Sequence, residues 1–249
     1  MLETPGARAF IRLRAAVIEA GILDRSLSYY WPLIVVVFGG YALSAWGIYR
    51  FEGYLPLAFA CLGFTFFTVQ LAGLMHDSGH RAVFRSVWAN NLLGYAASAS
   101  IGMVFPNWVN RHNTHHDHPN QEGRDPDLEV PFISMSEAQH QRKDPIQKLL
   151  SRWQALYYYP LGSIVGFSNR LGSISFFLKR RSRSDIGRLL LYLPAMFVLF
   201  ILPFILFAPE KAIFVFLMVH LTTGVYLANC FAPNHKGMTI IEKDTQLSF

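Results

Sequence analysis

Long runs without charged side chains divide this chain into apolar and polar stretches. Residues 31–49 carry no charge over 19 positions, and a helix of that length spans about 28 Å, the thickness of a bilayer core. Residues 55–75, 189–208 and 212–232 are similar runs of about 20 positions each. As core helices of a soluble protein they would leave too little polar surface to cover them. The pattern therefore predicts four transmembrane helices in two hairpins.

Shorter apolar patterns predict helices that lie on the membrane without crossing it. Residues 92–105 form an apolar run that is too short to span and is rich in small side chains, typical of a re-entrant or interfacial segment. Apolar residues recur at helical spacing over 146–156 and over 10–18, with charged or polar residues off the stripe. No linker suggests a second soluble domain. We therefore expect a single all-α integral membrane domain over residues 1–249.

The basic residues indicate which way the helices cross. The chain has 22 Lys and Arg against 16 Asp and Glu, a net charge of +6, which in a soluble protein would raise the question of nucleic acid. Here only Arg50 and Lys211 fall in the short connections between the helices of each hairpin. By the positive-inside rule, both termini and the central region 76–188 are expected in the cytoplasm. The expected partner is the lipid bilayer and no nucleic acid.

Five of the nine histidines are concentrated in two short motifs on this predicted cytoplasmic side. In HDSGH, His76 and His80 are four apart, so both imidazoles point from one face of a helix. In RHNTHH, His112, His115 and His116 lie within an arc of about 100° on a second helix. Packing offers no reason for five histidines on two helical faces near one membrane boundary. The spacing predicts a metal site.

The number of imidazoles favours two metal ions over one. Imidazole binds zinc, copper, iron or nickel, and a single zinc ion needs only three or four protein ligands. His235, three residues beyond the last apolar run, brings the candidates to six. HDSGH also differs from the zinc motif HExxH, because Asp77 is shorter than the glutamate base of that motif. Asp77 and Asp117 are better placed to accept hydrogen bonds from ligand N–H groups.

Three other histidines are interpreted differently. His118 falls on the opposite side of its helix from the second motif, so we exclude it from the ligands. His140 lies in a polar loop and is expected to be an ordinary hydrogen-bonded residue. His220 lies in the middle of a predicted span, where an ionisable group is costly, and both a buried hydrogen bond and a role near the site are open.

The two motifs and the spacing between them resemble the first two histidine boxes of the membrane fatty acid desaturases. FAPNHKGM, which contains His235, is similar to the stretch after the fourth span in bacterial acyl desaturases. The resemblance implies a non-haem centre of two iron ions, dioxygen as co-substrate and a fatty acyl substrate. It also implies an electron donor, a ferredoxin or a b-type cytochrome with its reductase. The implied ligands, taken residue by residue, are His76, His80, His112, His115, His116 and His235.

The desaturase family has a third box, HxxHH or QxxHH, after the fourth span, and no such motif follows residue 232 here. We therefore expect the domain to be C-terminally incomplete, one iron to be held poorly and the activity of this chain to be severely weakened. Hydroxylation or ketolation by the same di-iron chemistry is the nearest alternative. A non-catalytic membrane fragment and a metal-dependent membrane hydrolase are alternatives from other classes.

Overall fold

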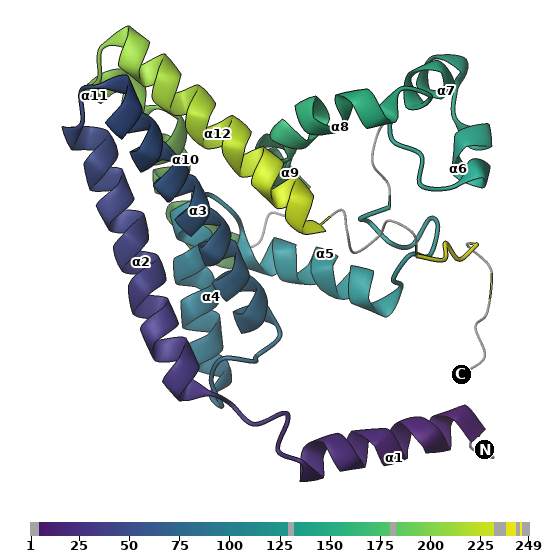
Figure 1. Ribbon diagram of the computed structural model, residues 1–249. Helices are drawn as coiled ribbons and strands as arrows, with labels where there is room; N and C mark the ends of the chain where they lie inside the picture. Colours follow the sequence, from purple (N-terminus) through teal and green to yellow (C-terminus); the bar gives the residue numbers. More distant parts are fainter. Residues whose placement is uncertain (1–4, 129–131, 180–182, 232–237, 243–244, 246–249) are drawn as a thin grey trace.

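The described part of the chain folds mainly into helices. A computed structural model describes residues 5–128, 132–179, 183–231, 238–242 and 245, and within these ranges the only extended pairing is a single bridge. The all-α class expected from the sequence is confirmed (Figure 1). The helices are α1 (Pro5–Glu19), α2 (Leu27–Arg50), α3 (Tyr54–Gly79), α4 (Val87–Ile101), α5 (Phe105–Asp117), α6 (Glu137–Arg142), α7 (Pro145–Ser151), α8 (Gln154–Ser163), α9 (Val165–Lys179), α10 (Arg183–Phe200), α11 (Leu202–Leu206) and α12 (Pro209–Phe231).

Three of these helices are long and apolar enough to cross a membrane. They are α2, α3 and α12, and they coincide with the predicted spans 31–49, 55–75 and 212–232. In Figure 1 they form the elongated bundle from which α5 projects. Their length and composition confirm the prediction of an integral membrane protein.

The predicted span 189–208 is divided between two helices. α10 ends at Phe200 and α11 begins at Leu202, with Ile201 between them. Pro203 stands in the first turn of α11, where its missing N–H needs no partner, but the same residue cannot extend the hydrogen bonds of α10. The apolar part of α10 is consequently shorter than a membrane-spanning helix.

The α2–α3 hairpin packs through small residues. A Cβ on Gly47 would lie 3.2 Å from the Cβ of Ala60, and one on Gly40 would lie 2.1 Å from the ring of Phe67. Between apolar helices in lipid, such close approach supplies the van der Waals contact that drives association. The facing surfaces of α3 and α12 add a hydrogen bond between the hydroxyls of Thr65 and Thr222, with the oxygens 2.7 Å apart.

A sharp turn connects the bundle to α5. α4 ends at Gly102, whose φ of 72° is a left-handed conformation that glycine adopts without strain. α5 then begins at Phe105, a buried residue whose ring covers Gly94 of α4. Because Phe105 fixes the start of α5 against α4, the rest of α5 leaves the bundle close to the end of α3, as Figure 1 shows.

The remaining helices expose apolar side chains. α1 has no buried residue, and Phe10, Leu13 and Ile18 are each about half exposed or more. The stripe predicted over 146–156 falls on two helices, α7 and α8, and its large apolar side chains are all exposed. Exposed apolar stripes of this kind fit helices that lie on a membrane surface.

Candidate metal centre

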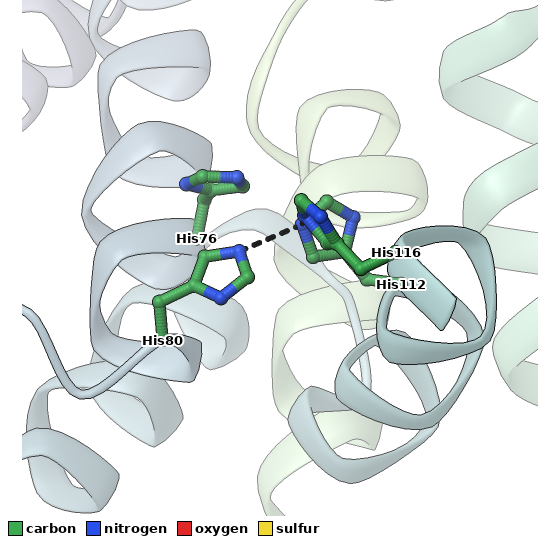
Figure 2. Close-up of side chains that lie close together, drawn as sticks. All are labelled: His76, His80, His112 and His116. Carbon is green, nitrogen blue, oxygen red and sulfur yellow. Dashed lines mark hydrogen bonds between the residues drawn. The ribbon is translucent and has the colours of Figure 1, made fainter. Parts of the chain in front are cut away.

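Two pairs of histidines face each other where the end of α3 meets α5. His76 and His80 lie one turn apart at the end of α3, and His112 and His116 lie one turn apart on α5 (Figure 2). One ring nitrogen from each histidine lies within 4.8 Å of the other three. The Nε2 atom of His112 is 3.0 Å from the Nε2 atoms of both His80 and His116. We call these residues the four-histidine cluster.

Local backbone structure fixes the first pair. α3 ends with His80 as its C-cap, and Arg81 then takes a left-handed φ of 56° that turns the chain away. The loop beyond it is held by the fully buried Asn90. The Asn90 amide donates to the carbonyls of Phe84 and Ser86 and accepts from the N–H of Phe84. The exit from the first histidine motif is therefore tied to α4.

Trp108 packs between the two helices that carry the cluster. Its indole stacks on His112 with ring centroids 4.4 Å apart and an angle of 18° between the planes, and it contacts His76 edge to face. A Cβ on Gly79 would lie 2.9 Å from a ring carbon of Trp108. The glycine of HDSGH therefore lets α3 approach the indole, and the indole in turn restricts the orientation of His112.

Two imidazoles of the cluster, those of His80 and His112, have a lowered pKa. Burial, followed by repulsion from the neighbouring imidazoles, lowers the pKa of His112 from 6.5 to about 3. The pKa of His80 is lowered by the same two effects. Both imidazoles are therefore neutral at pH 7, which is the form that binds metal ions.

Asp77 lies within hydrogen-bond distance of His76, the first residue of the α3 pair. The Nδ1 of His76 is 3.0 Å from the Oδ1 of Asp77, and the hydroxyl of Tyr30 on α2 donates to the Oδ2 of Asp77 at 3.0 Å. A carboxylate that accepts from one ring nitrogen leaves the other as the electron-pair donor. Tyr30 had no motif to mark it in the sequence, because its contact with Asp77 depends on how α2 packs against α3.

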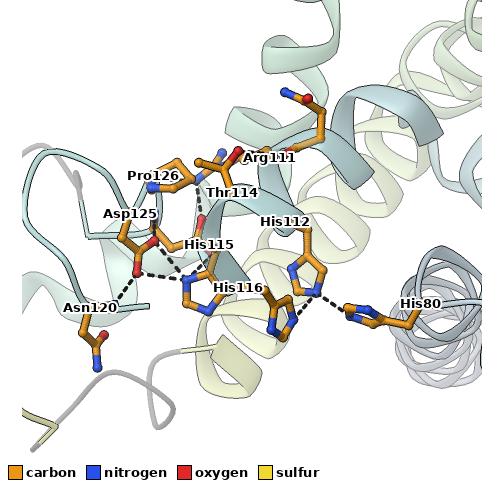
Figure 3. Close-up of polar contacts among 11 residues, drawn as sticks. His80, Arg111, His112, Thr114, His115, His116, Asn120, Asp125 and Pro126 are labelled. Carbon is orange, nitrogen blue, oxygen red and sulfur yellow. Dashed lines mark hydrogen bonds and ion pairs between the residues drawn. The ribbon is translucent and has the colours of Figure 1, made fainter. Parts of the chain in front are cut away.

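His115 of the second motif is not part of the four-histidine cluster. Its Nδ1 lies 2.9 Å from both carboxylate oxygens of Asp125, and Asp127 completes a second group of possible metal ligands (Figure 3). Asp117, the acceptor expected from the sequence, is exposed at the end of α5. Asp125 has no signal in the sequence, because its contact with His115 spans ten residues and a turn and so follows no helical period.

Among the described residues, His118, His140 and His220 fall outside both groups of possible ligands. His140 is hydrogen-bonded to the hydroxyl of Ser151 at 2.8 Å, as expected of an ordinary polar residue. His220 is buried, with its Nδ1 3.2 Å from the guanidinium of Arg170 and its Nε2 3.2 Å from the carbonyl oxygen of Leu199. Of the two alternatives open from the sequence, the structure shows the buried hydrogen bond. His235 lies outside the described residues.

The donors of the four-histidine cluster are suited to a first-row transition metal. Imidazole is a ligand of zinc, copper, iron and nickel, with metal–nitrogen bonds of about 2 Å. Four ring nitrogens within 4.8 Å of one another can therefore close around one ion. His80 and His116 are exposed, so such an ion is reachable from outside the bundle.

Comparison with known proteins identifies a family that this chain matches. Residues 52–248 match the family model described as fatty acid desaturase. The chain is 28% identical to a Delta(8)-fatty-acid desaturase of Euglena gracilis, over 91% of this chain and 56% of the relative. It is 30% identical to a Delta(5) fatty acid desaturase of Caenorhabditis elegans, over 68% of this chain and 38% of the relative.

A bacterial protein shows the same similarity over a shorter stretch. The chain is 29% identical to an sn-1 oleoyl-lipid 12-desaturase of Synechocystis, over 39% of this chain and 28% of the relative. The matches to these three relatives cover between about a quarter and just over half of each relative's length. All three relatives are desaturases, and they differ in the position that their names give to the double bond.

Proposed function

The chain belongs to the fatty acid desaturase family, and we propose from this premise that its histidines hold two iron ions and use dioxygen to introduce a double bond into a fatty acyl chain. The observation that carries the proposal is the four-histidine cluster, in which α3 and α5 bring four ring nitrogens within 4.8 Å of one another. Each histidine motif contributes two residues to it, so the site would lie between the two helices.

The ligands divide into two sets in this proposal. The four-histidine cluster holds one ion, and its imidazoles are nitrogen donors of the kind that iron accepts. His115 supplies a nitrogen toward the second ion, together with His235, the residue that matches the isolated family ligand. Asp77 and Asp117 are the proposed acceptors for ligand N–H groups, and for Asp77 the 3.0 Å contact with His76 supports this role.

The reaction requires a redox metal because of the substrate's chemistry. A methylene group has no acidic proton, so acid–base side chains alone cannot remove its hydrogens, and bound iron with dioxygen supplies the oxidising power that zinc lacks. The residues of this chain prepare the ligands for that ion. Burial keeps His112 neutral, Trp108 restricts its ring, and Asp77 orients His76.

The membrane placement follows from the three candidate spans. We propose that α10 and α11 together make the fourth crossing, so that α2–α3 and α10–α12 form two hairpins with their connections on the far side. Lys and Arg are concentrated outside those connections, which supports a cytoplasmic position for both termini and the histidine motifs. The four-histidine cluster then lies at the cytoplasmic end of α3.

The substrate and partners follow from this position. A fatty acyl chain dissolved in the bilayer reaches the cluster along the membrane, while its polar head group stays at the interface. The exposed apolar side chains of α1, α7 and α8 support an interfacial location for these helices beside that entry. Electrons come from a soluble or membrane-bound donor, a ferredoxin or a b-type cytochrome with its reductase, which meets the exposed side of the cluster.

Product analysis tests the reaction. The chain, purified in lipid nanodiscs and loaded with ferrous iron, is given acyl lipids, dioxygen and each donor system in turn. Mass spectrometry should find acyl chains that have lost two hydrogens. A product that gains oxygen would instead identify a hydroxylase or ketolase. Turnover with zinc in the absence of dioxygen would identify a hydrolase.

A further inference from the structure

Asp125 is a fully buried carboxylate outside the four-histidine cluster. Its exposed fraction is 0%, and it lies in the turn that follows α5. Burying a carboxylate is costly unless several donors surround it. Here the backbone N–H groups of Asn120 and Asp127 each donate to it at 2.8 Å, and the Nδ1 of His115 lies 2.9 Å from both oxygens (Figure 3).

This arrangement determines which nitrogen of His115 carries the proton. A carboxylate surrounded by N–H donors accepts and does not donate, so the His115 proton sits on Nδ1. Nε2 is then the nitrogen with the electron pair. Histidines that bind metals typically show this division, with one ring nitrogen on the metal and the other donating to a carboxylate.

His115 is also close to the four-histidine cluster. Its ring centroid is 5.5 Å from that of His116 and 6.1 Å from that of His112, on the same helix. The imidazole is thus held beside the first group of ligands by a carboxylate that does not belong to that group. His115 and the four-histidine cluster are therefore neighbours. Of these, His115 is the one that is hydrogen-bonded to a fully buried acid.

The turn that carries Asp125 is itself firmly attached. The Asp127 carboxylate accepts from Arg111 at 2.8 Å, which ties the turn back to α5. On the other side, Ile241 pairs with the turn through its N–H to the carbonyl of Asn120 and its carbonyl to the N–H of Glu122, both at 2.9 Å. A carboxylate on a rigid turn can hold a ring in one orientation, which a mobile one cannot.

We propose that Asp125 is a positioning residue that holds His115 as a ligand of the second metal ion, next to the ion of the four-histidine cluster. This inference rests on the proposed function for the presence of two ions. In this proposal the ligands of the two ions are held in place by different parts of the protein. The first is held by histidines from two helices, whereas the second depends on a single buried acid on the turn after α5.

Metal titration of the 249-residue chain in detergent tests this assignment. Cobalt(II) is the probe, because its visible absorption reports ligand geometry and its binding requires no turnover. The wild-type chain should bind two ions, the second more weakly. Asp125→Asn replaces one acceptor oxygen with an NH2 group, which faces N–H donors. It should lower the affinity for the second cobalt ion by about 10–100-fold and leave the affinity for the first ion unchanged.

Glu122→Gln is the matched control, because Glu122 is a buried acid on the same turn that pairs with Ser136 and Arg142 and belongs to neither group of possible metal ligands. It should leave both cobalt affinities nearly unchanged, and circular dichroism should show wild-type helix content in both variants. Asp125→Asn should have no further effect on cobalt binding in a His115→Ala background, because the acid acts through that ring.

Three results would overturn the assignment. They are wild-type affinity for the second ion in Asp125→Asn, an equal loss of both ions, and a loss that persists undiminished when His115 is already alanine. The last two would give Asp125 a purely structural role. A wild-type chain that binds no cobalt at the four-histidine cluster would contradict the proposed function itself, so the two failures are distinguishable.

Discussion

The membrane-spanning bundle and the turn after α5 are held together by different interactions. In the bundle, α2 and α3 approach through glycine, alanine and aromatic contacts, such as that of Gly47 with Ala60. In the turn, the buried carboxylates of Glu122 and Asp125 accept hydrogen bonds from side chains and backbone. A bundle in lipid gains little from hydrophobic association and depends on close packing, whereas the turn depends on satisfied polar groups.

We therefore expect the bundle to determine the stability of the fold and the histidines to determine metal binding. Changes in the bundle should alter how firmly the protein folds without altering its ligands. Changes at the histidines should alter metal binding while the helices persist, because α5 is fixed at its start by Phe105 and carries its histidines beyond that contact. Substitutions confined to one region or the other test that separation.

Replacing His112 with alanine should abolish tight metal binding. Its Nε2 lies 3.0 Å from two other imidazole nitrogens, so it is the centre of the four-histidine cluster. We expect metal affinity to fall by more than about 100-fold, beyond the loss typical of residues that only orient a ligand. Isothermal titration with cobalt measures the affinity, and circular dichroism should show unchanged helix content. Retention of wild-type affinity would remove His112 from the site.

A pair of glycine substitutions should affect the bundle in opposite ways. A Cβ on Gly224 of α12 would lie 2.0 Å from the carbonyl oxygen of Ser163, so Gly224→Ala should cost about 1–3 kcal/mol of stability or more through overpacking. Gly73 of α3 has no atom within 4 Å of that position, so Gly73→Ala should be neutral or stabilising, by up to about 1 kcal/mol. Denaturation in detergent measures both.

The same two variants should leave metal binding intact if they fold. Cobalt affinity measured below the midpoint of unfolding should match the wild type in both. An altered cobalt spectrum in Gly224→Ala would show that bundle packing and the four-histidine cluster are coupled, against the separation described above.

Acid should destabilise the metal-free protein through His112. Its pKa is about 3 in the folded chain and about 6.5 when unfolded, so between these values the unfolded chain binds more protons. The stability that neutral His112 contributes is complete above pH 6.5 and is lost as the pH falls towards 3. The free energy of unfolding, measured against pH, should fall less steeply in His112→Asn. An unchanged pH dependence in that variant would show that His112 does not contribute.

The parts predictable from the sequence are those with a periodic signal. Uncharged runs identified α2, α3 and α12, because length and polarity alone determine whether a helix can cross a bilayer. The i, i+4 spacing placed His76 with His80 and His112 with His116, because a helix puts such residues on one face. The break at Ile201 was missed because the run remains apolar through it, and only Pro203 marked it.

Contacts made by turns and by side-chain packing had no such signal. His115 shares its motif with His112 and His116, yet the geometry around Asp125 draws it into a separate group. The stacking of Trp108 on His112 likewise depends on how closely α3 and α5 approach. Spacing along a helix shows which residues share a face, but not which of them the neighbouring turn will bind.

We propose that α3 and α5 together form one metal site with imidazole ligands. X-ray absorption at the iron edge of the ferrous-loaded chain measures this directly. We predict iron with several nitrogen neighbours at about 2.0–2.2 Å and the outer-shell scattering typical of imidazole rings, with a marked loss of that scattering in His80→Ala with His112→Ala. Iron that is absent, or bound without imidazole and unaffected by the two substitutions, would contradict this assignment of the ligands.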